Sequence, residues 1–342
     1  MATNESFVAG GGLEGGPELI DAHTHVMRSE DHGREAFGYF LSRNPRSGHA
    51  AEPVAYGTVD ELRGIMRRNG VSRSNILMFT WSGQYWRDGQ FALPDGQAHA
   101  AAAAELRCRI VQRISDNNAW AQEVARENPE FSYFCGVDAV LMSEEQLLAE
   151  VEARVAHGAL GVKIVPRDMR IRGDDPRLRP LFDWCARQEV PVLTEASGHA
   201  GAPSRPAYFE KALSDFPSLK IIFAHCGHNP VFGEGADAEV VDLAQRFPGV
   251  AADLSLRLLE VADGHVAPQR LVEFVRDLGT DRVLYGSNYV LAELLQPDVD
   301  GSRPQPTRTE ASLAAFRALP FTPDEAEAIG SGNFRRITGR SC

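Results

Sequence analysis

Two histidines separated by one residue, His23 and His25, carry the strongest chemical signal in the sequence. They end a short apolar stretch that begins at Leu19 and is typical of a buried strand. Residues two apart on a strand face the same side, so both imidazoles would point into one cavity. Neighbouring imidazoles can bind zinc, iron, copper or nickel, so the pair predicts a metal site without selecting the metal. Asp21 is expected to support this site rather than to bind the ion.

A second signal is a stretch in which aromatic and charged residues alternate closely. It contains Trp81, Tyr85 and Trp86, with Arg87 beside them. Such residues could wall an apolar substrate and supply a polar anchor for it. The alternative is a lid that packs on the rest of the protein without touching a ligand.

Both signals lie in a chain where short apolar stretches alternate with longer helical patterns. This alternation favours parallel strands joined by helices, and eight such strands predict a (β/α)8 TIM barrel. The strands are predicted at Leu19–His25, Ser74–Thr80, Phe131–Val137, Gly161–Val165, Val190–Glu195, Lys220–His225, Val250–Ser255 and Arg282–Ser287. The helices are predicted at Val59–Arg68, Ala98–Glu127, Glu144–His157, Leu178–Gln188, Ala207–Asp215, Ala238–Arg246 and Arg270–Asp277, with a last helical region at Thr307–Thr338.

The ends and loops complete this prediction. Residues 1–16 are rich in glycine and indicate a flexible leader, so 17–342 is predicted to form one barrel domain. The segments Met27–Gly57 and Trp81–Gln97 are longer than a bare barrel needs. They follow strands one and two, so they are expected at the face where barrel enzymes place their active sites.

Composition and charge exclude several partners. The formal net charge of the 342 residues is −12 and Lys and Arg form no block, which argues against nucleic acid and against an anionic membrane surface. The five cysteines are an odd number and form no CxxC pair, so a reducing cytoplasm fits better than a disulfide framework. No apolar stretch approaches the roughly 18 residues of a membrane span.

Six motifs mark the strand ends and the end of the chain. They are Ile20-Asp21-Ala22-His23-Thr24-His25, Gly161-Val162-Lys163-Ile164-Val165-Pro166, Pro191-Val192-Leu193-Thr194-Glu195, Ile221-Ile222-Phe223-Ala224-His225-Cys226-Gly227, Val283-Leu284-Tyr285-Gly286-Ser287-Asn288-Tyr289 and Gly332-Asn333-Phe334-Arg335-Arg336. By these motifs the sequence resembles the amidohydrolase superfamily, in particular its branch of metal-dependent decarboxylases and hydrolases. By this resemblance His225, at the end of strand six, is a metal ligand. Lys163, at the end of strand four, could be carboxylated to bridge two metals, anchor a substrate, or balance Glu195.

Two positions depart from the family pattern. The family usually presents a histidine at the end of strand five, where this chain has Glu195, and an aspartate after strand eight, where it has Asn288. Asparagine can bind a metal through its carbonyl oxygen but cannot accept a proton, so hydrolysis would lose its usual base. Glu195 completes a set of two histidines and one carboxylate, which suits iron. The alternative is that Glu195 pairs with Lys163 or Arg167.

This ligand set resembles that of the nonheme diiron monooxygenases of platensimycin-type diterpenoid biosynthesis. The resemblance implies two irons, dioxygen and an electron donor, with hydroxylation of an apolar polycyclic acid or thioester. The alternative is a zinc- or manganese-dependent hydrolase or decarboxylase of an acid, ester or lactone, with Glu195 or His225 as the base. A third possibility is a catalytically silent barrel that binds a small molecule. The metal ligands are predicted as His23, His25, Glu195, His225 and Asn288, the catalytic residues as Lys163, Glu195 and Asn288, and further substrate contacts as His199 and His228; two chains could also pair as a homodimer.

Overall fold

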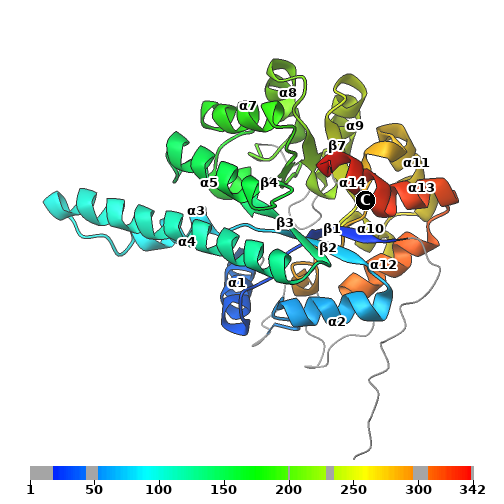
Figure 1. Cartoon of the computed structure of the whole chain (residues 1–342), viewed down its shortest axis with the longest axis horizontal. Helices are drawn as coiled ribbons and strands as arrows, with labels where there is room; N and C mark the ends of the chain where they lie inside the picture. Colours follow the sequence, from blue (N-terminus) through cyan, green and yellow to red (C-terminus); the bar gives the residue numbers. More distant parts are fainter. Residues whose placement is uncertain (1–17, 44–52, 199–200, 229–234, 296–306, 340–342) are drawn as a thin grey trace, which may run out of the picture.

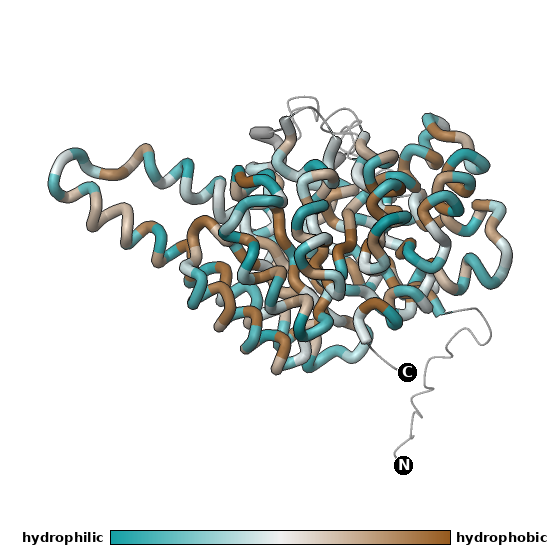
Figure 2. Tube along the Cα trace, turned by 90° about the horizontal axis from the view of Figure 1, so that it is seen from above, coloured by the Kyte–Doolittle hydropathy of each residue, from teal (hydrophilic) through white to brown (hydrophobic). Residues whose placement is uncertain are grey.

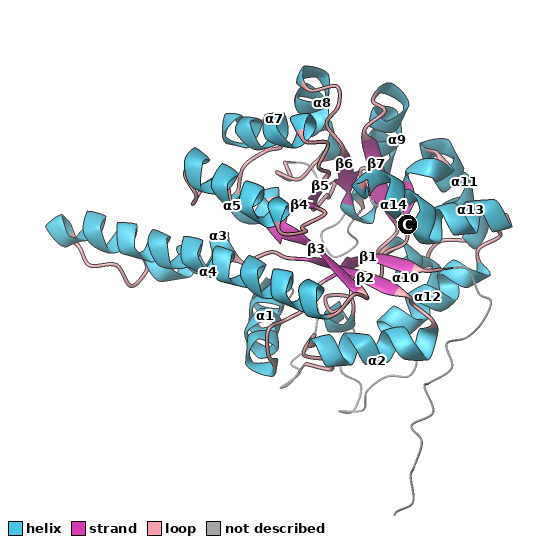
Figure 3. Ribbon diagram, viewed as in Figure 1, coloured by secondary structure: helices cyan, strands magenta, loops and turns pink. Residues whose placement is uncertain are grey.

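Eight short parallel strands form the centre of the molecule (Figure 3). The computed structural model describes residues 18–43, 53–198, 201–228, 235–295 and 307–339. The strands pair with one another in chain order from first to last, and all eight lie within or next to the predicted stretches. They are β1 (Ile20–Thr24), β2 (Arg73–Leu77), β3 (Phe131–Gly136), β4 (Gly161–Ile164), β5 (Val192–Thr194), β6 (Ile221–Phe223), β7 (Val250–Asp253) and β8 (Val283–Leu284).

The first and last strands approach each other and nearly close the barrel. The Ala22 N–H donates a hydrogen bond of 3.0 Å to the Tyr285 carbonyl oxygen. Beyond the end of β8, Thr24 and Tyr289 form an isolated parallel bridge. The predicted (β/α)8 TIM barrel is therefore confirmed.

Helices surround the strands, as Figure 1 shows. Each predicted helical segment contains a helix, and the capping residues Thr58 and Ser143 both form capping boxes. The α-helices are α1 (Glu30–Arg43), α2 (Val59–Asn69), α3 (Ser82–Gln90), α4 (His99–Glu127), α5 (Glu144–Ala156), α6 (Pro166–Met169), α7 (Arg179–Arg187), α8 (Glu210–Asp215), α9 (Asp237–Arg246), α10 (Arg257–Ala262), α11 (Pro268–Leu278), α12 (Arg308–Ala318), α13 (Pro323–Glu327) and α14 (Asn333–Thr338). Shorter turns are η1 (Gly96–Ala98), η2 (Pro176–Leu178), η3 (Pro206–Phe209), η4 (Ala224–Gly227), η6 (Thr280–Arg282), η7 (Glu293–Leu295) and η8 (Ala328–Gly332).

The hydrophobic core lies on both sides of the strands. A large cluster fills the space between strands and helices, and a smaller one fills the barrel interior. The interior cluster includes Phe334 and Ile337 from α14. Phe334 stacks on Phe134 of β3 with 6.4 Å between the ring centroids. The last helix of the described chain therefore helps to fill the interior of the barrel.

The two long segments after β1 and β2 are not simple loops. The first contains α1, and the second contains α3 and η1. Helices α3 and α4 form a hairpin that projects away from the barrel (Figures 1 and 2). Its base is held by a buried carboxylate, because Asp168 accepts a 2.9 Å hydrogen bond from the Gly83 N–H and another from Arg87.

The predicted leader, residues 1–16, lies outside the described residues, so the division of the chain at residue 17 stays a prediction. In the described part of the chain, every helix is too short or too polar to cross a membrane.

We expect Gly161→Ala to destabilise the barrel. A Cβ at Gly161 would lie 2.5 Å from the Phe134 ring, which the Phe334 ring keeps in place. Overpacking of this kind lowers the free energy of unfolding by about 1–3 kcal/mol. Urea denaturation followed by circular dichroism measures the change. The matched control is Gly38→Ala in α1, where a Cβ would meet no atom within 4 Å and stability should not fall.

Candidate metal centre

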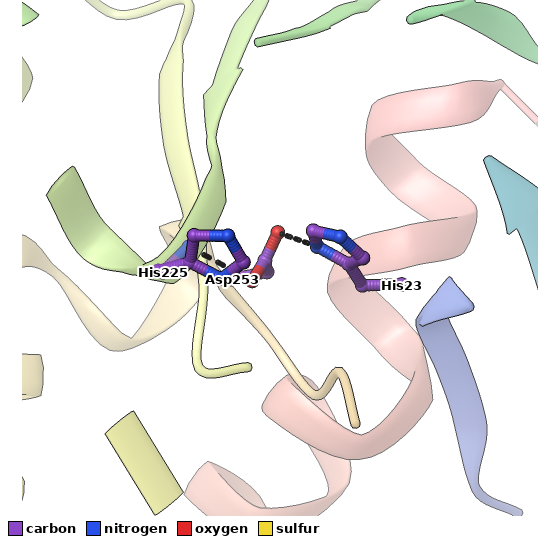
Figure 4. Close-up of side chains that lie close together, drawn as sticks. All are labelled: His23, His225 and Asp253. Carbon is purple, nitrogen blue, oxygen red and sulfur yellow. Dashed lines mark hydrogen bonds and ion pairs between the residues drawn. The ribbon is translucent and has the colours of Figure 1, made fainter. Parts of the chain in front are cut away.

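The candidate site lies where several strands end at the same face of the barrel. His23 belongs to β1, His225 follows β6 and Asp253 ends β7. Each offers one potential ligand atom, and these atoms lie within 4.8 Å of one another. Figure 4 shows the Asp253 carboxylate between the two imidazole rings. The structure therefore brings together two of the predicted ligands and the carboxylate of Asp253.

His25 is held in one tautomer by the neighbouring strand. Its Nδ1 lies 3.2 Å from the Leu77 carbonyl oxygen, which can only accept a hydrogen bond. Nδ1 must therefore carry the proton, and Nε2 carries a lone pair. The ring also packs edge-on against Phe79, with 5.0 Å between the centroids. Phe79 was not among the predicted site residues, yet its ring helps to fix the orientation of this imidazole.

Asp253 fixes the other two imidazoles. Its Oδ2 lies 2.8 Å from His23 Nδ1, and its Oδ1 accepts a 3.1 Å hydrogen bond from the His225 backbone N–H. His225 Nδ1 lies 2.7 Å from the Ser255 hydroxyl, which donates its own proton to Asp253 Oδ1. The rings of His23 and His225 thus both carry their proton on Nδ1, and the lone pair on Nε2 points away from Asp253. Asp253 is better suited to orienting the imidazoles than to binding the same ion.

The resulting arrangement leaves two lone pairs facing each other. His23 Nε2 and His25 Nε2 are 3.1 Å apart, yet neither atom carries a proton in these tautomers. Burial lowers the pKa of His23 and lowers that of His25 well below its ordinary value, so a shared proton is disfavoured. Two nitrogens at about 2.0–2.1 Å from one ion would have this separation. The pair therefore fits a divalent cation.

Asn288 lies beside this pair. Its backbone N–H donates a 2.9 Å hydrogen bond to the His23 carbonyl oxygen, and its φ of 60° is in the left-handed region. The side-chain Oδ1 is buried and has no hydrogen-bond partner among the described residues. Asp21 ties the same strand ends together, because it accepts a hydrogen bond of 2.9 Å from the Ser287 N–H. A buried carbonyl oxygen without a partner is a reasonable cation ligand.

Glu195 lies at the end of β5 and is buried. Its Oε2 accepts a hydrogen bond from the Ser204 hydroxyl, and its Oε1 lies 3.7 Å from Arg167 Nε. Oε1 has no hydrogen-bond partner in the described part of the chain. Glu195 does not join His23 in the group of close ligand atoms, so its ligand role stays a prediction. The alternative pairing with Arg167 is present as a loose ion pair.

Lys163 is also buried, with 3% of its surface exposed. Burial lowers its pKa to about 8, and the charges of Asp253 and Glu195 only partly oppose that effect. It lines a small cavity together with Phe79 and Val137.

The aromatic segment around α3 packs mainly on protein. Trp81 is buried against Phe79, and Trp86 contacts a hydrophobic cluster that includes Leu106. The Arg113 guanidinium lies over the Tyr85 ring, 4.3 Å from its centroid. Arg87 pairs with Asp168 at 2.9 Å. These contacts agree with the alternative in which this segment is a lid that packs on the rest of the protein. Substrate contacts by Trp81, Tyr85, Trp86 and Arg87 stay a prediction.

The two histidines predicted to lie beyond the strand ends differ in outcome. His228 Nε2 lies 3.0 Å from Glu260 Oε1, so its ring is paired with a carboxylate. His199 lies outside the described residues. Ser255 was not among the predicted site residues, although the alternation of Asp253 and Ser255 at a strand end places both side chains on one face.

The family model described as Amidohydrolase matches residues 20–340. A sequence comparison with curated proteins gives no match. Among solved structures, the fold is similar to a 5-carboxyvanillate decarboxylase from Sphingomonas paucimobilis, with a TM-score of 0.63, 14% identity and coverage of 95% of this chain and 100% of the other.

Two further structures have similar folds. One is an uncharacterized TIM-barrel protein from Bordetella bronchiseptica, with a TM-score of 0.64, 19% identity and coverage of 94% of this chain and 100% of the other. The other is a dihydroxybenzoic acid decarboxylase from a Polaromonas species with bound manganese and the inhibitor 2-nitroresorcinol, with a TM-score of 0.61, 15% identity and coverage of 95% and 98%. At these identities the similarity establishes the fold.

We expect Asp253→Asn to weaken metal binding. The amide cannot accept both Nδ1–H and hydroxyl protons as an ionised carboxylate does, so the imidazoles lose their fixed tautomers. Loss of such a partner typically lowers metal affinity by about 10–100-fold. Equilibrium dialysis against Mn²⁺ measures the change, and Asp60→Asn on the exposed start of α2 is the control. Unchanged affinity in Asp253→Asn would refute the orienting role.

Proposed function

Because this chain belongs to the amidohydrolase family, we propose that it is a metal-dependent decarboxylase of a small organic acid. The observation that carries the proposal is the pair of buried Nε2 lone pairs on His23 and His25, 3.1 Å apart. The names of similar structures support the reaction class, since two of them are decarboxylases. The fold places the lone pairs at the ends of the strands, where barrel enzymes bind their substrates.

His23 and His25 would hold the ion through Nε2, with His225 Nε2 and Asn288 Oδ1 as further ligands. Imidazole nitrogens and an amide oxygen suit manganese or zinc as well as iron. A bound divalent cation supplies positive charge that binds the acid and stabilises the negative charge that develops as carbon dioxide leaves. Asp253 and Ser255 keep the imidazoles oriented throughout.

Decarboxylation needs a proton to replace the carboxylate on the substrate carbon. Asn288 stands where the family usually has an aspartate, and an amide cannot supply this proton. Glu195 is the best-placed alternative, since its Oε1 is buried and makes no hydrogen bond to described residues. The Ser204 hydroxyl holds the other oxygen and so orients the group. In this proposal Oε1 of Glu195 gives the proton to the substrate carbon, and Asn288 only binds the metal ion.

The iron monooxygenase that the sequence also predicts is a weaker candidate. The similar structures named above are decarboxylases or uncharacterized, and manganese is the metal that one of them names. None of these names supports iron, dioxygen or a diterpenoid substrate. The monooxygenase therefore remains a hypothesis. The metal-reloading experiment described next tests it together with the decarboxylase.

The proposed activity should depend on added metal and not on dioxygen. Metal-free protein is reloaded with Mn²⁺, Zn²⁺ or Fe²⁺ under anaerobic conditions. Each form is then assayed with a panel of hydroxybenzoic acids, esters and lactones, first without dioxygen and then with it. We expect carbon dioxide release from an acid with at least one metal and no turnover without metal. Oxygen uptake with two irons bound per chain would instead support the monooxygenase, and release of an alcohol from an ester or lactone would support a hydrolase.

We expect Glu195→Gln to abolish turnover while metal binding persists. Loss of a positioned acid or base typically lowers the rate by about 10²–10⁴-fold. Carbon dioxide release measures turnover, and elemental analysis measures the metal content. The control is Glu210→Gln on the exposed face of α8, which should leave both unchanged. Loss of metal from Glu195→Gln would assign Glu195 as a ligand, in place of the proton-transfer role.

A further inference from the structure

A cavity at the end of the barrel opposite the candidate metal centre leads to one further inference. Its volume is about 340 Å³, and it lies where β6, β7 and β8 begin, lined there by Lys220, Val250 and Arg282. We infer that this cavity, the lower pocket, binds a small organic oxyanion, which is a phosphate monoester or a carboxylate with an apolar body. The lower pocket is separate from the metal centre and does not depend on the proposed function.

Part of the lining of the lower pocket is apolar. Val250 and Ala251 of β7 lie in it together with Ile337 of α14, and all three residues are buried. Figure 1 shows α14 beside β7. The volume falls in the range of about 300–1,000 Å³ that is typical of small-molecule pockets, and apolar walls favour a ligand that has an apolar body.

Two arginines bring positive charge to the same pocket. Arg282 Nη1 donates hydrogen bonds to three backbone carbonyl oxygens around the start of β7, at 3.0, 3.2 and 3.3 Å. Arg336 Nη2 donates to the Asp281 carbonyl oxygen. Carbonyl oxygens carry no net charge, so these bonds orient the guanidinium groups without neutralising them. The remaining N–H groups of both side chains have no acceptor among the described residues.

In this respect the two arginines differ from a close neighbour. Arg335, next to Arg336 on α14, forms an ion pair with Glu18. The whole chain has a formal net charge of −12, so carboxylates are more numerous than cations. Within the described ranges, however, neither Arg282 nor Arg336 has a carboxylate at ion-pair distance. The charge of both arginines is therefore available to a ligand.

A lysine and two carboxylates complete the charges of the pocket. Lys220 Nζ donates a 3.3 Å hydrogen bond to the Ile337 carbonyl oxygen and lies 3.7 Å from Glu189 Oε2. The Glu189 side chain is 76% exposed, so this ion pair contributes little. The Asp281 carboxylate also lines the pocket and forms no ion pair in the described part of the chain. Three cations and two carboxylates leave a net positive charge.

This arrangement suits an oxyanion better than a neutral molecule. A guanidinium group presents its N–H donors in one plane, which matches the oxygen atoms of a carboxylate or a phosphate. Arg282 is already held by three carbonyl oxygens, so little side-chain freedom is lost when a ligand binds. The arginines would bind the charged group of the ligand, and the apolar residues would contact its body.

The experiment titrates the full chain with phenyl phosphate, benzoate and the neutral benzyl alcohol. The methyl NMR signals of Val250 report binding in the lower pocket, because Val250 begins β7 and the candidate metal centre lies at the other end of that strand. We expect phenyl phosphate or benzoate to bind there about tenfold or more tightly than benzyl alcohol. Tighter binding of phenyl phosphate would identify a phosphate monoester as the ligand, and tighter binding of benzoate would identify a carboxylate.

Arg336→Met should lower the affinity for the preferred anion by about tenfold or more. Arg336 is exposed and donates to a backbone carbonyl oxygen, so the variant is expected to fold, and urea denaturation checks this. The matched control is Arg335→Met on the same helix, which removes a charge outside the pocket and should leave the affinity within about twofold. Equal binding of the three compounds, unchanged Val250 signals, or an unchanged affinity in Arg336→Met would overturn the inference.

Discussion

The site depends on one electrostatic constraint, the close approach of two buried imidazole lone pairs. The Leu77 carbonyl oxygen accepts the Nδ1 proton of His25, and the Asp253 carboxylate accepts the Nδ1 proton of His23. These two acceptors fix the tautomers of both imidazoles. Protein groups alone leave this arrangement repulsive, and a cation makes it favourable. Through Ser255 the Asp253 carboxylate also orients His225, so one carboxylate at the end of β7 orients two of the three imidazoles.

The fold could be predicted from the sequence because parallel strands buried on both faces read as short apolar runs and helices as longer periodic ones. The His23 and His25 pair could also be placed, since its spacing and its position at a strand end follow from the period of a strand. The α4 helix was predicted, but the α3 segment was predicted as a loop, because this short helix contains Gly83 and Gly89 and few apolar positions. Its attachment through Asp168 depends on a contact between segments far apart in sequence.

The electrostatics of the site could not be predicted in the same way. Asp253 and His23 are 230 residues apart in the sequence, so no local pattern predicts their pairing. Whether Glu195 binds a metal or moves a proton is decided by distances of a few ångströms, and composition carries no such information. Its contacts with Ser204 and with Arg167 arise only when segments on different parts of the chain come together in the fold.

The near closure of the barrel has a consequence for how the protein is made. The hydrogen bond between the Ser287 N–H and Asp21 spans 266 residues, and α14 adds Phe334 to the interior only from the end of the described chain. During synthesis the first strand therefore leaves the ribosome long before its partners exist. Until the last strand is made, the sheet around His23 and His25 is incomplete. The pocket around these histidines can therefore form only when almost the whole chain has been translated.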